Sequence, residues 1–247
     1  MLDTVLRLVG PRGRALAFSA AIAASLAACD TAPPEPSRDP ALAGAALNTS
    51  APDPDAPLPE PDAKLLAPEK ATEQAPATFK AKFHTTQGDF VLEAHREWSP
   101  LGVDRLYNLV KIGFFSDVAF FRAVEGFVAQ FGIHGHPKVS AVWQKANIQD
   151  EPVKEGNKRG RLVFAKAGPN TRSTQFFLNL NDNKSLDAMG FAALAEVVEG
   201  MSVVDSLYKG YGEAPSRHQG TIGKQGNSFL RKEFPKLDYI TSAEIVP

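Results

Sequence analysis

Apolar and polar residues alternate clearly from position 79 onward. In segment 79–86, apolar residues at 79, 81 and 83 alternate with polar residues at 80, 82 and 84, which is typical of a half-buried strand. Gln87, Gly88 and Asp89 are turn-forming residues, and a second apolar run follows at 90–95. The two runs together predict a β-hairpin.

Two segments have the helical period. Ser99 is suited to cap a helix, Pro100 to its first position, and Gly113 to its end, with apolar residues at 103, 106, 109 and 110 on one face. A second helix is predicted over 201–207. Further short apolar runs, separated by glycine and asparagine, lie at 118–124, 127–132, 161–167, 174–179, 191–198 and 237–246.

These runs predict a mainly β domain of about eight strands and two helices. We expect a closed eight-stranded antiparallel barrel with helices over its open ends. The polar, glycine-rich stretch 210–226 contains no predicted helix or strand.

The first 29 residues have a different pattern. Arginines at 7, 12 and 14 precede a mostly apolar run at 15–26, as in a secretory signal peptide, and the run is shorter than the roughly 20 residues of a membrane span. Residues 26–29, Leu-Ala-Ala-Cys, resemble the bacterial lipoprotein cleavage box. That resemblance implies a signal peptide over 1–28, lipidation of Cys29 and, through Asp30, retention at the inner membrane. Ordinary signal cleavage nearby is the alternative.

The next segment, 29–78, is predicted to be a linker. Positions 30–78 hold 11 of the 19 prolines, nine acidic and three basic residues, and no aromatic residue. Such a composition buries too little apolar area to offset the entropy of ordering, so we expect a disordered tether. A proline-motif ligand for a partner is the less favoured interpretation.

The remainder, 79–247, contains both tryptophans, all four tyrosines and all phenylalanines except Phe18, which predicts one folded domain. The whole chain has 27 basic and 28 acidic residues, a balance that argues against nucleic-acid binding. Its single cysteine excludes an intramolecular disulfide and zinc sites with several cysteines. The sequence contains no run of 18 apolar residues and therefore predicts no membrane span.

Familiar catalytic motifs are absent from the sequence. It contains no Gly-x-Ser-x-Gly, no Gly-Lys-Ser/Thr and no His-Glu-x-x-His. His134 and His136 form a His-x-His pair, but without further ligands nearby we interpret them as part of a solvated loop and predict no metal site.

Two stretches carry candidate chemistry: 120–130 (FFRAVEGFVAQ) and 164–177 (FAKAGPNTRSTQFF). Arg122 interrupts an apolar strand, which is costly unless a polar group meets it. Gln130 lies eight positions later, with the strand parity of Arg122. In the second stretch, Gln175 and Phe177 share one face of a strand, while Phe176 faces the core.

These stretches closely resemble the cyclophilin-type peptidyl-prolyl isomerases, over about 79–246. Further matches in the same order are 85–89 (TTQGD), 108–110 (NLV), 113–115 (GFF), 186–187 (LD) and 199–205 (EGMSVVD). The resemblance implies an enzyme without metal or cofactor that accelerates rotation about X-Pro bonds. It implies Arg122 and Gln130 as catalytic residues. The residues implied to bind the peptide are Phe127, Val128, Ala165, Lys166, Ala167, Gln175, Phe177, Leu186 and Phe191.

The sequence departs from the family pattern at several positions. Phe131-Gly132 stands where Gly-Gly is usual, Lys166 replaces a common asparagine, and Lys184-Ser185 replaces a bulky aromatic residue. Phe191 stands where His or Tyr is common, and Leu194-Ala195 replaces Phe-Gly. These changes predict a more open pocket.

Three functional hypotheses follow. The first is an exported, membrane-tethered isomerase facing the periplasm, monomeric, with proline-containing polypeptides as substrates and Cys29 as its lipid anchor. The second is a cyclophilin-like peptide-binding module with little turnover. The third is a structural envelope lipoprotein. That role would not explain why the site residues occur together. The sequence favours the first.

Overall fold

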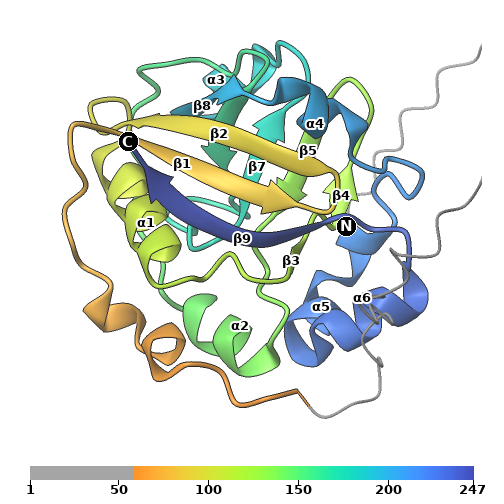
Figure 1. Cartoon of the computed structure of the whole chain (residues 1–247). Coiled ribbons are helices and arrows are strands. Elements are labelled where there is room, and N and C mark those ends of the chain that lie inside the picture. The colour runs from red at the N-terminus through yellow and green to blue at the C-terminus, as the bar shows by residue number, and fades with distance from the viewer. Residues whose placement is uncertain (1–57) are drawn as a thin grey trace, which may run out of the picture. The chain divides into compact units, whose positions relative to one another are not determined.

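In the computed structural model, which describes residues 58–247, nine strands form one antiparallel sheet (Figure 1). The predicted signal peptide, Cys29 and the first part of the predicted linker lie outside these residues. The strands are β1 (Thr78–Thr85), β2 (Gly88–His95), β3 (Val118–Ala119), β4 (Arg122–Ala123), β5 (Val128–Phe131), β6 (Arg161–Phe164), β7 (Phe176–Asn179), β8 (Ala193–Glu199) and β9 (Tyr239–Val246).

The strand order is β3-β9-β1-β2-β8-β6-β7-β5-β4, and register shifts in three of the strand pairs increase the local twist of the sheet. The expected closed barrel of eight strands is therefore corrected to an open sheet of nine. The reason lies in the run 118–124, which divides into β3 and β4. These two strands pair with β9 and β5 at opposite edges, and only Phe120 and Phe121 connect them.

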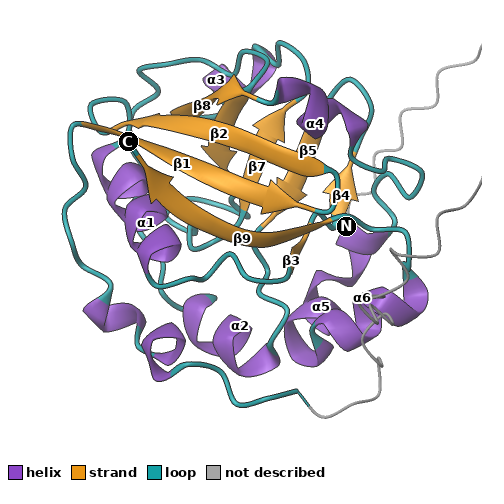
Figure 2. Ribbon diagram, in the orientation of Figure 1, coloured by secondary structure: helices purple, strands orange, loops and turns teal. Residues whose placement is uncertain are grey.

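Helices are more numerous than the two that the pattern predicts. The α-helices are α1 (Pro100–Lys111), α2 (Pro137–Trp143), α3 (Ser185–Ala188), α4 (Met201–Ser206), α5 (Gln219–Gln225) and α6 (Asn227–Glu233). The predicted helices correspond to α1 and α4. Figure 2 shows α2 beside α5 and α5 beside α6. None of the helices in the described part of the chain is long and apolar enough to cross a membrane.

The main core fills the space between the curled sheet and α1. The predicted alternation in β1 is confirmed, because Phe79, Ala81 and Phe83 are buried and the residues between them are only partly buried. Phe83 stacks on Phe90 with 5.1 Å between ring centroids, and Phe131 stacks on Phe176 at 5.9 Å. Phe176 thus faces the core, as predicted, and its packing there holds β7 in place.

Residues 58–77, which we call the N-terminal strap, belong to the predicted linker but pack against the domain. The side chain of Leu65 is buried in the main core, and its carbonyl accepts a hydrogen bond from Trp143 Nε1 at 2.8 Å. Glu73 N donates to Asn108 Oδ1 at 3.0 Å, and Asn108 Nδ2 donates to Glu73 O at 2.7 Å. The packed region therefore begins before residue 79, because contacts with α1 and α2 offset the cost of ordering this proline-containing segment.

Residues 208–236, which we call the C-terminal arm, link α4 to β9. The arm contains α5, α6 and a short 3-10 helix (Pro215–His218), so the stretch 210–226 is largely helical rather than without structure. Ile222 and Leu230 from the arm pack with Phe121 in a second hydrophobic cluster. Burial of these side chains stabilises two helices of seven residues each, which are too short to be stable alone.

Candidate active site

A cavity of about 350 Å³ opens beside β4, β5, β6 and β7. All eleven residues of the predicted site line it. They are Arg122, Phe127, Val128, Gln130, Ala165, Lys166, Ala167, Gln175, Phe177, Leu186 and Phe191. The sheet thus brings together side chains from stretches that are up to 69 residues apart in sequence. Their individual roles stay predictions.

The position of Arg122 follows from strand pairing. In the β4–β5 hairpin Arg122 lies directly opposite Gln130, so both side chains leave the same face of the sheet. Arg122 Nη1 donates to Gln130 Oε1 at 3.2 Å, and its guanidinium carbon lies 5.5 Å from the ring centroid of Phe127. On its other side Arg122 Nη2 donates to the carboxylate of Glu213, which lies in the C-terminal arm. The guanidinium is held at the edge of the cavity.

A series of glutamine amides continues from this arginine across the cavity. Gln130 Nε2 donates to Gln175 Oε1 at 2.9 Å, and Gln175 Nε2 donates to Gln219 Oε1 at 3.1 Å. Gln130 is buried, and both its amide oxygen and its amide nitrogen form hydrogen bonds within the site. The series fixes the orientation of each amide and forms a polar side of the cavity.

The opposite side of the cavity is apolar. Val128, Phe177 and Leu186 are buried in a third hydrophobic cluster, against which Phe127 and Phe191 are partly buried. Phe177 and Phe191 meet edge to face, with 5.8 Å between ring centroids. Such a surface suits a compact aliphatic ring, because it offers apolar contact without a group that requires a charge.

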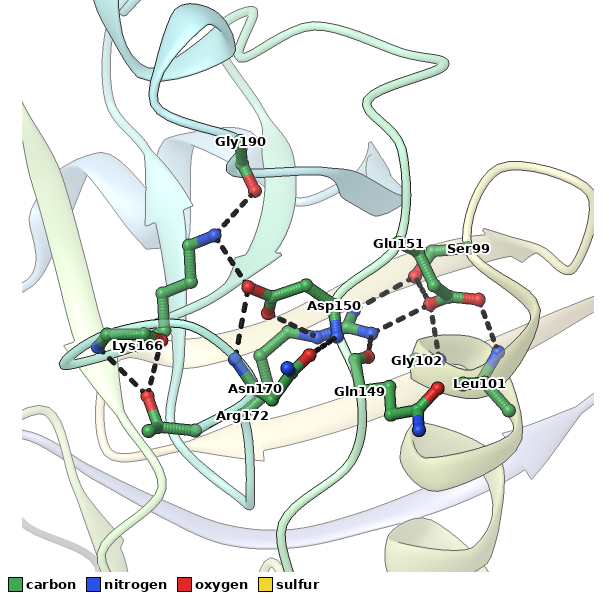
Figure 3. Close-up of polar contacts among 12 residues, drawn as sticks. Ser99, Leu101, Gly102, Gln149, Asp150, Glu151, Lys166, Asn170, Arg172 and Gly190 are labelled. Atoms are coloured by element: carbon green, nitrogen blue, oxygen red, sulfur yellow. Dashed lines mark hydrogen bonds and ion pairs between the residues drawn. The ribbon is translucent and has the colours of Figure 1, made fainter.

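Lys166 joins two loops at the rim of the cavity (Figure 3). Its Nζ donates to Asp150 Oδ2 at 3.1 Å and to Gly190 O at 3.0 Å, and it lies 5.2 Å from the ring centroid of Phe191. Burial raises the pKa of Asp150, but hydrogen bonds from the Asn170 amide and Lys166 outweigh it and hold that pKa below its ordinary value. The Lys166 side chain therefore connects the two loops. The asparagine that is common at this position in the family is too short to make both contacts.

Behind this rim, Arg172 is buried in an ionic cluster that also holds α1 (Figure 3). Arg172 Nη2 donates to Glu151 Oε2 at 3.1 Å, and Glu151 accepts from the backbone N–H groups of Leu101 at 2.8 Å and Gly102 at 3.1 Å. Glu151 thus caps the N-terminus of α1 from a distant loop, where a negative charge is favourable. Ser99, the predicted capping residue, donates its hydroxyl to the same carboxylate instead.

Two backbone N–H groups of the segment 165–167 form hydrogen bonds within the domain. Ala165 N donates to Gln175 O at 2.9 Å, and Ala167 N donates to Thr171 Oγ1 at 3.0 Å. These two amide hydrogens are engaged within the domain.

Four residues near the cavity escaped the sequence analysis. Thr171, Ser173 and Gln219 line the cavity, and Glu213 contacts Arg122 at its edge. Thr171 and Ser173 lie within the stretch 164–177, whose polar residues mark them as candidates. Gln219 and Glu213 come from the C-terminal arm, where no local pattern marks them.

The His-x-His pair lies apart from this cavity. His134, expected in a solvated loop, is instead buried, and its Nδ1 accepts a hydrogen bond from His136 N at 2.9 Å. Its ring packs edge to face on Phe114 with 5.1 Å between centroids. Across residues 58–247, no three His, Cys, Asp or Glu side chains gather closely enough to hold a metal ion.

Comparison with known proteins gives a consistent result. The model of the family described as cyclophilin type peptidyl-prolyl cis-trans isomerase/CLD matches residues 80–224. Peptidyl-prolyl cis-trans isomerase B of Escherichia coli (strain K12) is 31% identical over 174 residues, which cover 66% of this chain and 97% of that protein. A peptidyl-prolyl cis-trans isomerase of Acinetobacter baylyi is 29% identical over 138 residues, 53% of this chain and 72% of that protein.

A solved structure of a cyclophilin type peptidyl-prolyl cis-trans isomerase from Cryptosporidium parvum has a similar fold. It shares 18% sequence identity, with a TM-score of 0.51 over 69% of this chain and 98% of that chain. The likeness supports the arrangement of a curled, open sheet with helices described above.

Proposed function

Because the chain belongs to the cyclophilin-type peptidyl-prolyl cis-trans isomerases and is an enzyme of that class, we propose that it catalyses X-Pro rotation by arginine-assisted stabilisation of the twisted amide in the cavity described above. The observation that carries this proposal is the position of Arg122. Its guanidinium is held at the edge of an apolar surface that fits a proline ring.

The reaction requires no bond to be broken. Rotation must overcome a barrier of about 18–20 kcal/mol, which arises from the partial double bond of the amide. In the twisted transition state the proline nitrogen is no longer conjugated and becomes a hydrogen-bond acceptor. A donor that meets this nitrogen therefore stabilises the transition state more than the planar ground state.

The arginine can supply only part of the transition-state stabilisation, and the rest of the cavity must supply the remainder. A charge-assisted hydrogen bond contributes about 1.5–3 kcal/mol, which is one to two factors of ten in rate. A five-decade acceleration needs about 7 kcal/mol. The remainder is assigned to Phe127, Phe177 and Leu186, which would hold the ring, and to Gln130 and Gln175, which would hold the adjoining backbone.

The test is a cis-to-trans rate assay on an Ala-Pro peptide with the full chain purified in detergent. We expect acceleration by the native protein, and a loss of one to two factors of ten in kcat/KM for Arg122→Ala. Full turnover in Arg122→Ala would overturn the assigned role of Arg122. Peptide binding without acceleration by the native protein would favour a binding module with little turnover.

We also propose that the substrates are exported polypeptides, and that the enzyme is a monomer anchored in the bacterial envelope by lipid on Cys29, facing the periplasm. The support is the basic, apolar and small-residue pattern of 1–29 and the Leu-Ala-Ala-Cys ending. One acyl chain anchors weakly, so stable attachment requires a second acyl chain or another membrane-binding signal.

The anchor can be tested by metabolic labelling in bacterial cells with an alkyne-bearing palmitate. We expect label in the native chain and none in Cys29→Ala, with recovery of the native chain in the inner-membrane fraction. Unlabelled native protein free in the periplasm would support ordinary signal cleavage instead.

A further inference from the structure

The C-terminal arm touches the candidate site at two places. Glu213 accepts a hydrogen bond from Arg122 Nη2, and Gln219 accepts one from Gln175 Nε2 at 3.1 Å. The arm thus supplies a residue at each end of the polar series that runs from Arg122 through Gln130 to Gln175. The mechanism proposed above uses neither arm residue.

Backbone pairing brings Glu213 to this position. Gly212 forms an antiparallel β-bridge with Ala123, the neighbour of Arg122 in β4. This backbone pairing therefore places the following residue, Glu213, next to Arg122.

The rest of the arm is fixed to the body of the domain. At its start Tyr208 N donates to Asp238 Oδ2 at 2.7 Å. In α6, Asn227 Nδ2 donates to Asp117 O at 2.7 Å, and Arg231 Nη2 pairs with the Asp117 carboxylate at 2.6 Å. These contacts, with the second hydrophobic cluster, make the arm a rigid support.

An arginine side chain has several rotatable bonds, and ordering it costs free energy. The hydrogen bond from Nη1 to Gln130 would not by itself prevent rotation about the outer side-chain bonds of Arg122. A second acceptor on Nη2 determines the plane of the guanidinium. Five N–H hydrogens are available, so two contacts leave donors for a substrate. Glu213 is 52% exposed in its side chain and Arg122 24%, so the carboxylate lies at the solvent side of the pair.

We propose that Glu213 is a positioning residue, which orients the Arg122 guanidinium for the proline nitrogen from the side opposite Gln130. The inference rests on the proposed role of Arg122. Glu213 itself does not touch the substrate.

The experiment is a double-mutant cycle in the full chain, with kcat and KM measured on the Ala-Pro peptide for Glu213→Ala, Arg122→Ala and the double variant. We expect Glu213→Ala to lower kcat by about fivefold to tenfold at nearly constant KM. In the Arg122→Ala background the same substitution should change nothing, because the residue acts only through the arginine.

Two further variants separate positioning from structure and from charge. Glu213→Gln keeps an oxygen acceptor and should recover most of the lost kcat. Glu233→Ala removes a carboxylate elsewhere in the arm and should leave kinetics unchanged. Glu213 is exposed, so the thermal midpoint of Glu213→Ala should match the native protein.

Each failure has a distinct signature. Equal losses from Glu213→Ala in both backgrounds would overturn the positioning role, as would an increase in kcat, which would mean that the carboxylate withholds the arginine from substrate. Unchanged kcat in Arg122→Ala would instead overturn the proposed function on which the inference rests.

Discussion

Arg122 and Gln130 occupy directly opposite positions on the antiparallel strands β4 and β5, and the guanidinium Nη1 donates to the amide Oε1 at 3.2 Å. The eight-residue spacing gives this pairing because the hairpin turn is compact and brings residues of equal parity to one face. The glutamine thereby has two functions available to it, as support of the arginine and as a group that meets a peptide.

The shape of the arginine matters as much as its charge. Arg122→Lys keeps the charge but loses the planar fork that contacts Gln130 and Glu213 together. We expect this variant to lose about tenfold or more of kcat/KM in the Ala-Pro assay. Near-native turnover of Arg122→Lys would contradict the assignment, because it would show that a point charge suffices.

Lys166 is expected to affect peptide binding rather than the rotation step. Lys166→Met keeps the aliphatic stem but loses the hydrogen bonds to Asp150 and Gly190, so the two loops at the rim become less fixed. KM should rise about threefold with kcat little changed, in line with the loss of a hydrogen bond. Lys158→Met, at an exposed lysine, is the matched control. A KM equal to that of the native enzyme would refute this view of the rim.

The N-terminal strap should contribute to stability without affecting turnover. Leu65→Ala removes a buried side chain and should lower the free energy of unfolding by about 2–3 kcal/mol. Urea unfolding followed by tryptophan fluorescence measures this, because Trp143 donates to the Leu65 carbonyl. Leu58→Ala, at an exposed leucine of the same strap, is the control. Equal stability of the Leu65 and Leu58 variants would show that the strap is not held against the domain in solution.

His134 should make the fold sensitive to mild acid. Burial lowers the pKa of its ring from 6.5 to about 4. Between those pH values the unfolded chain binds a proton that the folded chain does not, so the free energy of unfolding falls as the pH decreases through this window. The full loss is on the order of 3 kcal/mol.

His134→Asn removes the titrating ring and keeps an acceptor for His136 N. Urea unfolding at several pH values between 7 and 4 should show a flatter dependence in this variant than in the native protein. Parallel curves for the two proteins would rule His134 out as the source of acid sensitivity.

The site could be predicted further than the support around it. The alternation in β1 is visible because burial repeats every second residue. In β7 all four residues are buried, so alternation of burial does not mark that strand. The eleven cavity residues were found by resemblance to a family, which preserves spacing between distant stretches.

The strap and the arm could not be found in this way. The strap is ordered by one buried leucine and by hydrogen bonds to side chains more than 25 residues away, such as the Asp104 carboxylate that accepts from Ala75 N. In α5, Gly220 and Gly223 are poor helix formers, and the helix exists because Ile222 is buried against the body. The contact between Arg122 and Glu213 spans 91 residues, and no local pattern carries it.

Strand order also has a kinetic consequence. The first strand of the sheet, β1, pairs with the last, β9, and β3 reaches the sheet only through β9. The β3-β9-β1 edge therefore cannot be completed until residues 239–246 have been synthesised. Contacts between such distant segments slow folding, because loops must close before the pairing rewards them. During synthesis this side of the sheet therefore stays unpaired until the last strand has been made, although the strands from β2 to β4 can already pair.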